Sequence, residues 1–183
     1  QDPRGRDGAG VTALDVLICT YERPDHVVHA ARDALRQCGP EDRVTVLDQS
    51  RRVTPTRRAL EALGDPRLDV LAAPARGLPA ARNAILARTR RPRVVFLDDD
   101  VRLEPSCLDA HRRALDEPHV GATVGRIDER GAGWNAATTA CRVDAVGRVR
   151  VCLDGDVPVE VESVKGCNMG FRREALEAIG AFD

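Results

Sequence analysis

The chain lacks the sequence motifs of several common enzyme classes. No GxGxxG follows the first apolar segment, which argues against a dinucleotide site, and the absence of GxxxxGKS or GxxxxGKT excludes a P-loop. No GxSxG is present, so a serine hydrolase of the α/β type would lack its nucleophile. The six cysteines form no CxxC pair, and the sequence therefore shows neither a zinc site nor a thioredoxin-like motif.

Long apolar runs and a strong net charge are also missing. No segment approaches the ~20 residues of a membrane span, and no signal peptide is recognisable. The formal net charge of −1 gives no global attraction to nucleic acid or to an anionic membrane. Cys19 falls in an apolar segment, where a free thiol acts as a small hydrophobe, and we expect a reducing, cytoplasmic compartment.

The 183 residues predict one domain in which strands and helices alternate. Residues 1–12 are rich in glycine and charge, and a flexible lead-in is predicted there, before a domain over 13–183. Strands are predicted over 14–19, 44–47, 68–71, 94–97 and 120–124, and helices over 24–38, 56–63, 79–89 and 105–115. This order is typical of a doubly wound α/β fold, with a mostly parallel sheet and helices on both faces.

The alternation fades after Gly125. Residues 126–162 predict irregular structure with a hairpin formed by 148–153 and 157–161. A strand that leads into a loop is expected next, followed by a helix over 173–179. Trp134 lies in the irregular part, where it could stack on a sugar face or equally cap the core.

The most informative stretch is VVFLDDDV, in which four apolar residues run directly into Asp98, Asp99 and Asp100. Such an apolar run is typical of a strand buried on both faces of a parallel sheet, and ligands bind beyond the carboxyl ends of such strands. Three carboxylates there repel one another unless a cation lies between them. Their oxygen atoms suit Mg²⁺ or Mn²⁺, which commonly carry a phosphate-bearing substrate. In isolation the same residues could also form a solvated acidic turn.

Two further strand ends carry polar residues suited to a nucleotide. The first leads into Thr20, Tyr21, Glu22 and Arg23, and the second ends in Asp48, Gln49 and Ser50. A carboxylate at the second position accepts hydrogen bonds from a ribose hydroxyl or a base N–H, although Asp48 is equally compatible with a simple turn. Arg76 precedes the third helix and could reach a base or a diphosphate, whereas Arg82 is interpreted as part of a solvated helix face.

Three segments together resemble the family 2 glycosyltransferases, which adopt the GT-A fold. LDVLICTYERPDHV is similar to the opening strand and nucleotide loop, where the family often has asparagine in place of Glu22. ARGLPAARNAILARTRRPRVVFLDDDVRLEPSCL resembles the helix and strand that lead to the metal-binding DxD motif. VKGCNMGFRREALEAIGAFD resembles the acceptor-side loop and helix, which usually end in GGFDE.

The resemblance implies a metal-dependent, inverting transfer of a sugar from a nucleotide diphosphate donor, with a UDP-sugar preferred, to an unknown acceptor hydroxyl. It divides the domain into a nucleotide-sugar-binding part over 14–125 and an acceptor-side part over 126–183, which we expect to be incomplete. Thr20, Tyr21, Glu22 and Asp48 would hold the base and ribose, and Arg76 would lie near the base or diphosphate. Asp98 and Asp99 would contact the nucleotide, while Asp100, with Asp98, would bind Mn²⁺ or Mg²⁺.

The catalytic base is the least defined part of this interpretation. Inversion needs a carboxylate that takes the proton of the acceptor hydroxyl, and Asp183 is the candidate in this chain. Two alternatives remain open at this point. One is a non-catalytic nucleotide-sugar binding module, or a truncated donor half of a larger enzyme. The other is a magnesium phosphohydrolase of the haloacid dehalogenase type, for which Arg102 stands where threonine or valine is needed.

Overall fold

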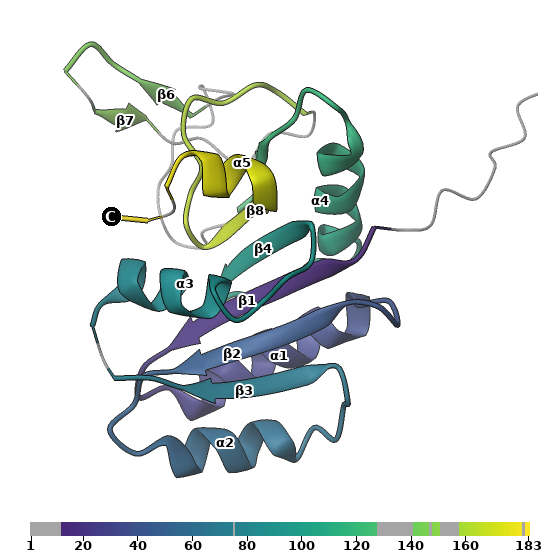
Figure 1. Ribbon diagram of the computed structural model, residues 1–183, viewed down its shortest axis with the longest axis vertical. Coiled ribbons are helices and arrows are strands. Elements are labelled where there is room, and N and C mark those ends of the chain that lie inside the picture. Colours follow the sequence, from purple (N-terminus) through teal and green to yellow (C-terminus); the bar gives the residue numbers. More distant parts are fainter. Residues whose placement is uncertain (1–11, 75, 128–140, 147, 151–157, 181) are drawn as a thin grey trace, which may run out of the picture.

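A six-stranded sheet forms the centre of the molecule, with the strand order β3-β2-β1-β4-β8-β5 (Figure 1). The computed structural model describes residues 12–183 except 75, 128–140, 147, 151–157 and 181. Its strands are β1 (Leu14–Thr20), β2 (Arg43–Asp48), β3 (Leu68–Ala72), β4 (Arg93–Asp98), β5 (Ala122–Val124) and β8 (Asn168–Arg172). β3, β2, β1 and β4 run parallel, whereas β8 is antiparallel to both β4 and β5.

Helices cover both faces of this sheet. They are α1 (Pro24–Gln37), α2 (Val53–Glu61), α3 (Leu78–Leu86), α4 (Cys107–Asp116) and α5 (Arg173–Ala178). Proline stands in the first turn of α1 and of α3, where its missing N–H costs nothing. None of the helices in the described part of the chain has the length and apolar character of a membrane span.

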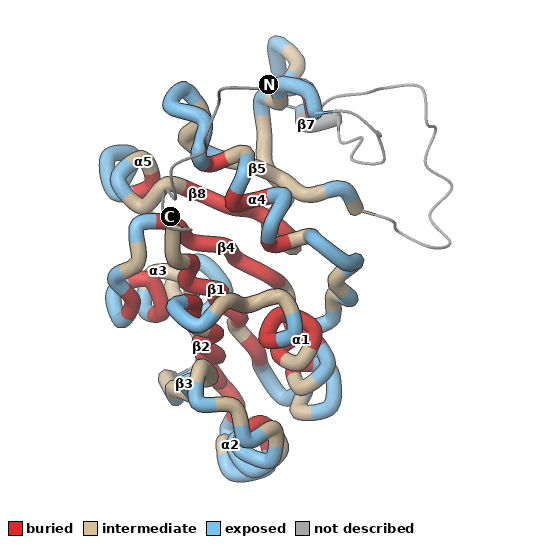
Figure 2. Tube along the Cα trace, turned by 90° about the vertical axis from the view of Figure 1, so that its right-hand side faces the viewer, coloured by how far each residue is buried: buried red, intermediate tan, exposed pale blue. Residues whose placement is uncertain are grey.

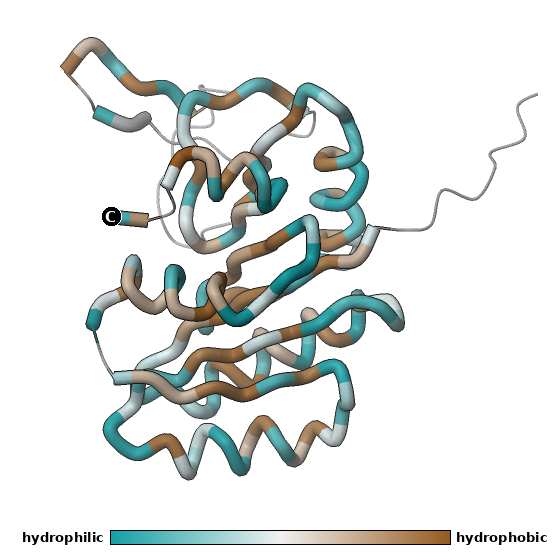
Figure 3. Tube along the Cα trace, in the orientation of Figure 1, coloured by the Kyte–Doolittle hydropathy of each residue, from teal (hydrophilic) through white to brown (hydrophobic). Residues whose placement is uncertain are grey.

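The alternation of side chains along the strands decides which helix packs on which face. Val16 and Ile18 of β1 belong to a core that includes α1, Leu60 of α2 and Leu108 of α4. Leu17, between them, belongs to a second core with Ile85 of α3 and Leu176 of α5. β1, β2, β4 and β8 are accordingly buried along most of their length, whereas the edge strands β3 and β5 are only partly buried (Figure 2), and hydrophobic residues run through the sheet (Figure 3). The predicted doubly wound α/β fold with helices on both faces is confirmed.

The C-terminal part differs from the sequence prediction. The strand expected just after residue 161 forms later, as β8, and it inserts between β4 and β5 instead of adding to an edge. The described hairpin pairs β6 (Arg142–Val143) with β7 (Val149–Arg150), whereas the predicted pairing used 157–161 as the second strand. The predicted lead-in, apart from residue 12, and Trp134 lie outside the described residues.

Candidate functional site

The carboxyl ends of β2, β1 and β4 bring Asp48, Thr20 and Asp99 close together. Thr20 is the register partner of Asp48, and Cys19 is that of Asp98, so Asp99 follows beside Thr20. Side chains two residues apart in a strand lie on the same face of the sheet. Thr20 is two residues after Ile18, and Asp48 is two residues after Val46, so both lie on the α1 face. All three side chains are buried. The structure thus gathers three of the predicted nucleotide residues on adjacent strands.

Asp99 is held by residues of the first strand and its loop. The Thr20 hydroxyl donates a hydrogen bond to Asp99 Oδ2 at 2.6 Å. Arg23 Nη1 lies 3.2 Å from Asp99 Oδ1 and 3.1 Å from Asp100 Oδ2, so one guanidinium bridges two successive carboxylates. Asp99, and to a lesser extent Asp100, raise the pKa of Arg23. The sequence identified Arg23 only as one of the polar residues after β1. The structure shows in addition that it pairs with Asp99 and Asp100.

Asp98 points toward the opposite face of the sheet, because it follows Val94 and Phe96 in the alternation. Arg82 Nη2 of α3 lies 3.3 Å from Asp98 Oδ1 and donates a hydrogen bond to the Gly166 carbonyl at 2.9 Å. Burial raises the pKa of the Asp98 carboxyl, and the positive charge of Arg82 opposes that rise.

The interpretation of Arg82 as part of a solvated helix face is therefore wrong. Its side chain is only 13% exposed because the loop at Gly166 covers it. A Cβ on Gly166 would come within 2.7 Å of Arg82 Nη2, so a side chain at this position would have to displace the guanidinium.

Asp48 carries a buried carboxylate oxygen that has no hydrogen-bond partner among the described residues. Its Oδ1 accepts a hydrogen bond from the Ser50 backbone N–H at 2.8 Å. Within the described part of the chain, no donor reaches Asp48 Oδ2. Because a buried acceptor without a partner is costly, this oxygen suits a ligand hydroxyl or N–H. Asp48 therefore forms the turn considered as its alternative role and still keeps one oxygen for binding.

The remaining predicted residues lie at the surface, in the loops that follow β1 and β3. Tyr21 is exposed, and Arg76 is exposed in the loop before α3. Glu22 adopts a left-handed backbone (φ 56°), and its Oε1 accepts a hydrogen bond from the Arg51 N–H at 2.9 Å. Its own N–H donates to Ser50 Oγ at 2.7 Å. Glu22 thus joins the loops that follow β1 and β2.

Asp183 is exposed and follows a residue that is firmly packed. The side-chain amide of Asn83 donates to the Phe182 carbonyl at 2.6 Å and accepts from the Phe182 N–H at 3.0 Å. The Phe182 ring lies 5.2 Å from the Phe96 ring, and the Arg82 guanidinium lies 5.6 Å from its centroid. The segment that carries Asp183 is thereby fixed beside the Arg82–Asp98 pair.

The chemistry of the aspartates fits a divalent cation that is shared with a ligand. Among the described residues, no group of three or more histidine, cysteine or acidic side chains forms a complete metal cage. Asp99 and Asp100 nevertheless hold a cationic group, the Arg23 guanidinium, and their oxygen atoms are the donors that Mg²⁺ and Mn²⁺ prefer. Mg²⁺ is commonly bound by one or two carboxylates together with substrate phosphates.

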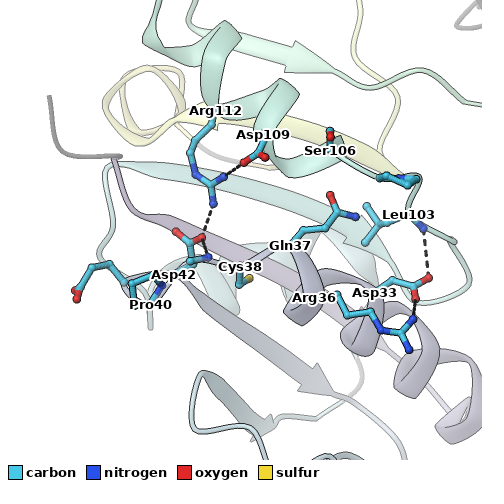
Figure 4. A pocket seen from close by; sticks show the side chains of 13 residues that line it. Asp33, Arg36, Gln37, Cys38, Pro40, Asp42, Leu103, Ser106, Asp109 and Arg112 are labelled. Atoms are coloured by element: carbon cyan, nitrogen blue, oxygen red, sulfur yellow. Dashed lines mark hydrogen bonds and ion pairs between the residues drawn. The ribbon is translucent and has the colours of Figure 1, made fainter. Parts of the chain in front are cut away.

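A large surface hollow lies elsewhere, between α1 and α4. It measures about 960 Å³, and none of the predicted site residues lines it. Its charged groups pair with one another, since Arg112 contacts both Asp42 and Asp109, and Asp33 pairs with Arg36 (Figure 4). We therefore assign it no part in the site at the strand ends.

Comparison with known proteins identifies the family of the chain and agrees with its fold. Residues 15–180 match the model of glycosyl transferase family 2. A mannosyltransferase from Pyrobaculum calidifontis, solved in complex with GDP-Man and Mn²⁺, is similar with a TM-score of 0.70 and 22% identity over 97% of this chain. S. aureus TarS 1–349 is similar with a TM-score of 0.68 and 18% identity over 93% of this chain. Comparison with curated protein sequences gives no match.

The fold and the acidic strand end define a GT-A-type α/β domain. The chain belongs to glycosyl transferase family 2. It spans 49% of the mannosyltransferase chain and 50% of the TarS chain, so about half the length of each. The family match gives no support to the phosphohydrolase alternative.

Proposed function

We propose that the chain binds a nucleotide diphosphate sugar together with Mn²⁺ or Mg²⁺ and takes part in an inverting transfer of the sugar to an acceptor hydroxyl. The observation that carries the proposal is the row of Asp48, Thr20 and Asp99 beside Asp100, in which Asp48 Oδ2 is buried and has no hydrogen-bond partner among the described residues. Family membership and the GDP-Man and Mn²⁺ in one structural neighbour support it. A UDP-sugar remains the preferred donor.

In this proposal each strand end has a distinct role. Asp48 accepts a hydrogen bond from the base or ribose, with Thr20, Tyr21 and Glu22 around it, and Arg76 lies near the base or diphosphate. Asp98 and Asp99 contact the nucleotide, and Asp100, with Asp98, holds the metal. The metal neutralises the charge that develops on the diphosphate leaving group.

On the acceptor side, the proposal assigns a role to the segment at Asp183. Asp183 is the candidate base, and its fixed neighbour Phe182 would hold it near the Arg82–Asp98 pair.

The cysteines support the proposed reducing, cytoplasmic compartment. Those that the structure describes are free thiols, namely Cys19, Cys38, Cys107, Cys141 and Cys167.

The first experiment is a calorimetric titration of the protein with UDP, GDP and dTDP, each with and without Mn²⁺. We expect one nucleotide to bind, and to bind more tightly with the metal. A hydrolysis assay with the matching nucleotide sugar then separates a domain that turns over from a module that only binds. If a demonstrably folded protein binds none of the three nucleotides, the proposal is wrong.

Substitution Asp48→Ala tests the key residue. Because a hydrogen bond to a charged group contributes about 1.5–3 kcal/mol, we expect affinity for the free nucleoside diphosphate to fall by about tenfold or more. Asp69→Ala is the matched control, since Asp69 is an exposed acid on the neighbouring strand β3. If Asp48→Ala weakened binding of the nucleotide sugar but not of the free nucleoside diphosphate, the role given to Asp48 would be contradicted.

A further inference from the structure

The Arg23 side chain occupies the position in which a cation is needed. It reaches from the loop between β1 and α1, and one nitrogen contacts Asp99 Oδ1 at 3.2 Å and Asp100 Oδ2 at 3.1 Å. Arg23 is 53% exposed and Asp100 51%, whereas Asp99 is 8% exposed. The guanidinium therefore lies over the open side of the carboxylate pair, on the path from solvent.

The two arginines at this strand end are held differently. Arg82 is 13% exposed, pairs with Asp98 and is also bound to the Gly166 carbonyl. Arg23 is half exposed, and its contacts with Asp100 are of the exposed kind that contribute little free energy. A ligand that competes for these carboxylates would consequently displace Arg23 before Arg82.

We infer that Arg23 is an internal competitor of the divalent cation: its guanidinium neutralises Asp99 and Asp100 until the cation displaces it from Asp100. The inference rests on the proposed function, because it assigns Asp100 to the metal. It also adds a role for Arg23, which sets how strongly the site attracts the cation. Without this counter-charge, Asp99 and Asp100 would bind divalent ions more tightly, including in the absence of donor.

The test measures Mn²⁺ binding directly, by electron paramagnetic resonance of free Mn²⁺, with no nucleotide and then with the nucleotide that calorimetry identifies. In the Arg23→Gln variant we expect Mn²⁺ affinity to rise about fivefold, the effect of releasing one exposed ion pair. Arg23→Lys keeps the charge but loses the planar guanidinium, and we expect an intermediate affinity. Arg36→Gln is the matched control, since Arg36 is 69% exposed on α1, pairs with Asp33 and carries the same charge.

The outcomes distinguish this inference from the proposed function. Equal or weaker Mn²⁺ binding in Arg23→Gln, with circular dichroism showing an intact fold, overturns the inference alone if Mn²⁺ still strengthens nucleotide binding. An equal rise in Arg36→Gln also overturns it, because net charge would then explain the effect. If Mn²⁺ changes nucleotide binding in neither protein, the metal dependence itself is wrong, and the inference fails with it.

Discussion

His111 is a buried side chain whose two ring nitrogens each lie within hydrogen-bond distance of a neighbouring side chain. Its Nδ1 lies 2.7 Å from Thr123 Oγ1, and its Nε2 lies 2.8 Å from Asn168 Oδ1. A neutral ring satisfies both contacts, because Nε2 donates to the amide oxygen and Nδ1 accepts from the hydroxyl. Burial lowers the pKa of His111, and the hydrogen bond to Asn168 opposes that shift. The neutral ring thus joins α4, β5 and β8.

This pKa shift predicts a pH-dependent stability. The unfolded chain takes up a proton at His111 near the ordinary pKa of about 6.5, whereas the folded protein does so only at lower pH. The unfolded state therefore binds more protons below that value, and the free energy of unfolding falls as pH decreases from 7 to 5. Urea denaturation at both pH values measures the loss, which should shrink in His111→Gln and persist in the control His119→Gln, where the histidine is exposed. The same pH dependence in wild type and His111→Gln would refute this account.

The sequence predicts those residues of the candidate site that lie at the carboxyl ends of apolar strands. An apolar strand that ends in acids predicts carboxylates at the ligand-binding edge of the sheet, and the structure shows Asp48 and Asp98 at the ends of β2 and β4, with Asp99 and Asp100 directly after β4. The partners of these acids were not predictable. Arg23 and Arg82 reach the aspartates because successive side chains point to opposite faces, where the loop before α1 supplies Arg23 and α3 supplies Arg82. That assignment needs the arrangement of helices in space.

At the scale of elements, β8 shows why the last strand was misplaced. Parallel strands buried on both faces are continuous apolar runs, and β1, β2 and β4 were located from that pattern. β8 reads NMGFR, with a polar residue and a glycine that weaken the signal. Its partners β4 and β5 lie more than 40 residues earlier in the sequence, so local pattern could not reveal the insertion.

Gly170 of β8 gives a direct test of this packing. A Cβ added there would lie 2.5 Å from Thr123 Oγ1 and 2.8 Å from His111 Nδ1, which are held by their mutual hydrogen bond. We expect Gly170→Ala to lower the free energy of unfolding by about 1–3 kcal/mol, the usual cost of overpacking. Gly39→Ala is the control, because its nearest contact would be an ordinary 3.6 Å. Unfolding curves in urea compare the two, and equal stability would mean that β8 has room for a side chain.

At the scale of the whole molecule, the sheet separates two sets of side chains, one on each face. Asp48, Thr20 and Asp99 belong to the α1 face, whereas Asp98, Arg82 and Phe182 lie on the α3 face. Phe182 closes the second core against Phe96 and Phe171, whose rings lie 5.2 and 6.4 Å from its own. The segment before Asp183 therefore stabilises the domain from the α3 face, opposite Asp48, Thr20 and Asp99, and it lies on the same face as Asp98.

This separation predicts that stability and nucleotide binding respond differently to Phe182→Ala. A half-buried phenylalanine that packs on two rings should contribute about 2 kcal/mol, less than the 3–5 kcal/mol of a fully buried one. Nucleoside diphosphate affinity should stay within about twofold of wild type, because Phe182 packs on the face opposite Asp48, Thr20 and Asp99 and contacts Asp98 through Arg82. Ile179→Ala, at a side chain that is 73% exposed, should change neither quantity. Urea denaturation and calorimetry on the same preparations test both expectations, and a large loss of affinity in Phe182→Ala would show that the Phe182 segment supports the nucleotide site through Arg82 and Asp98.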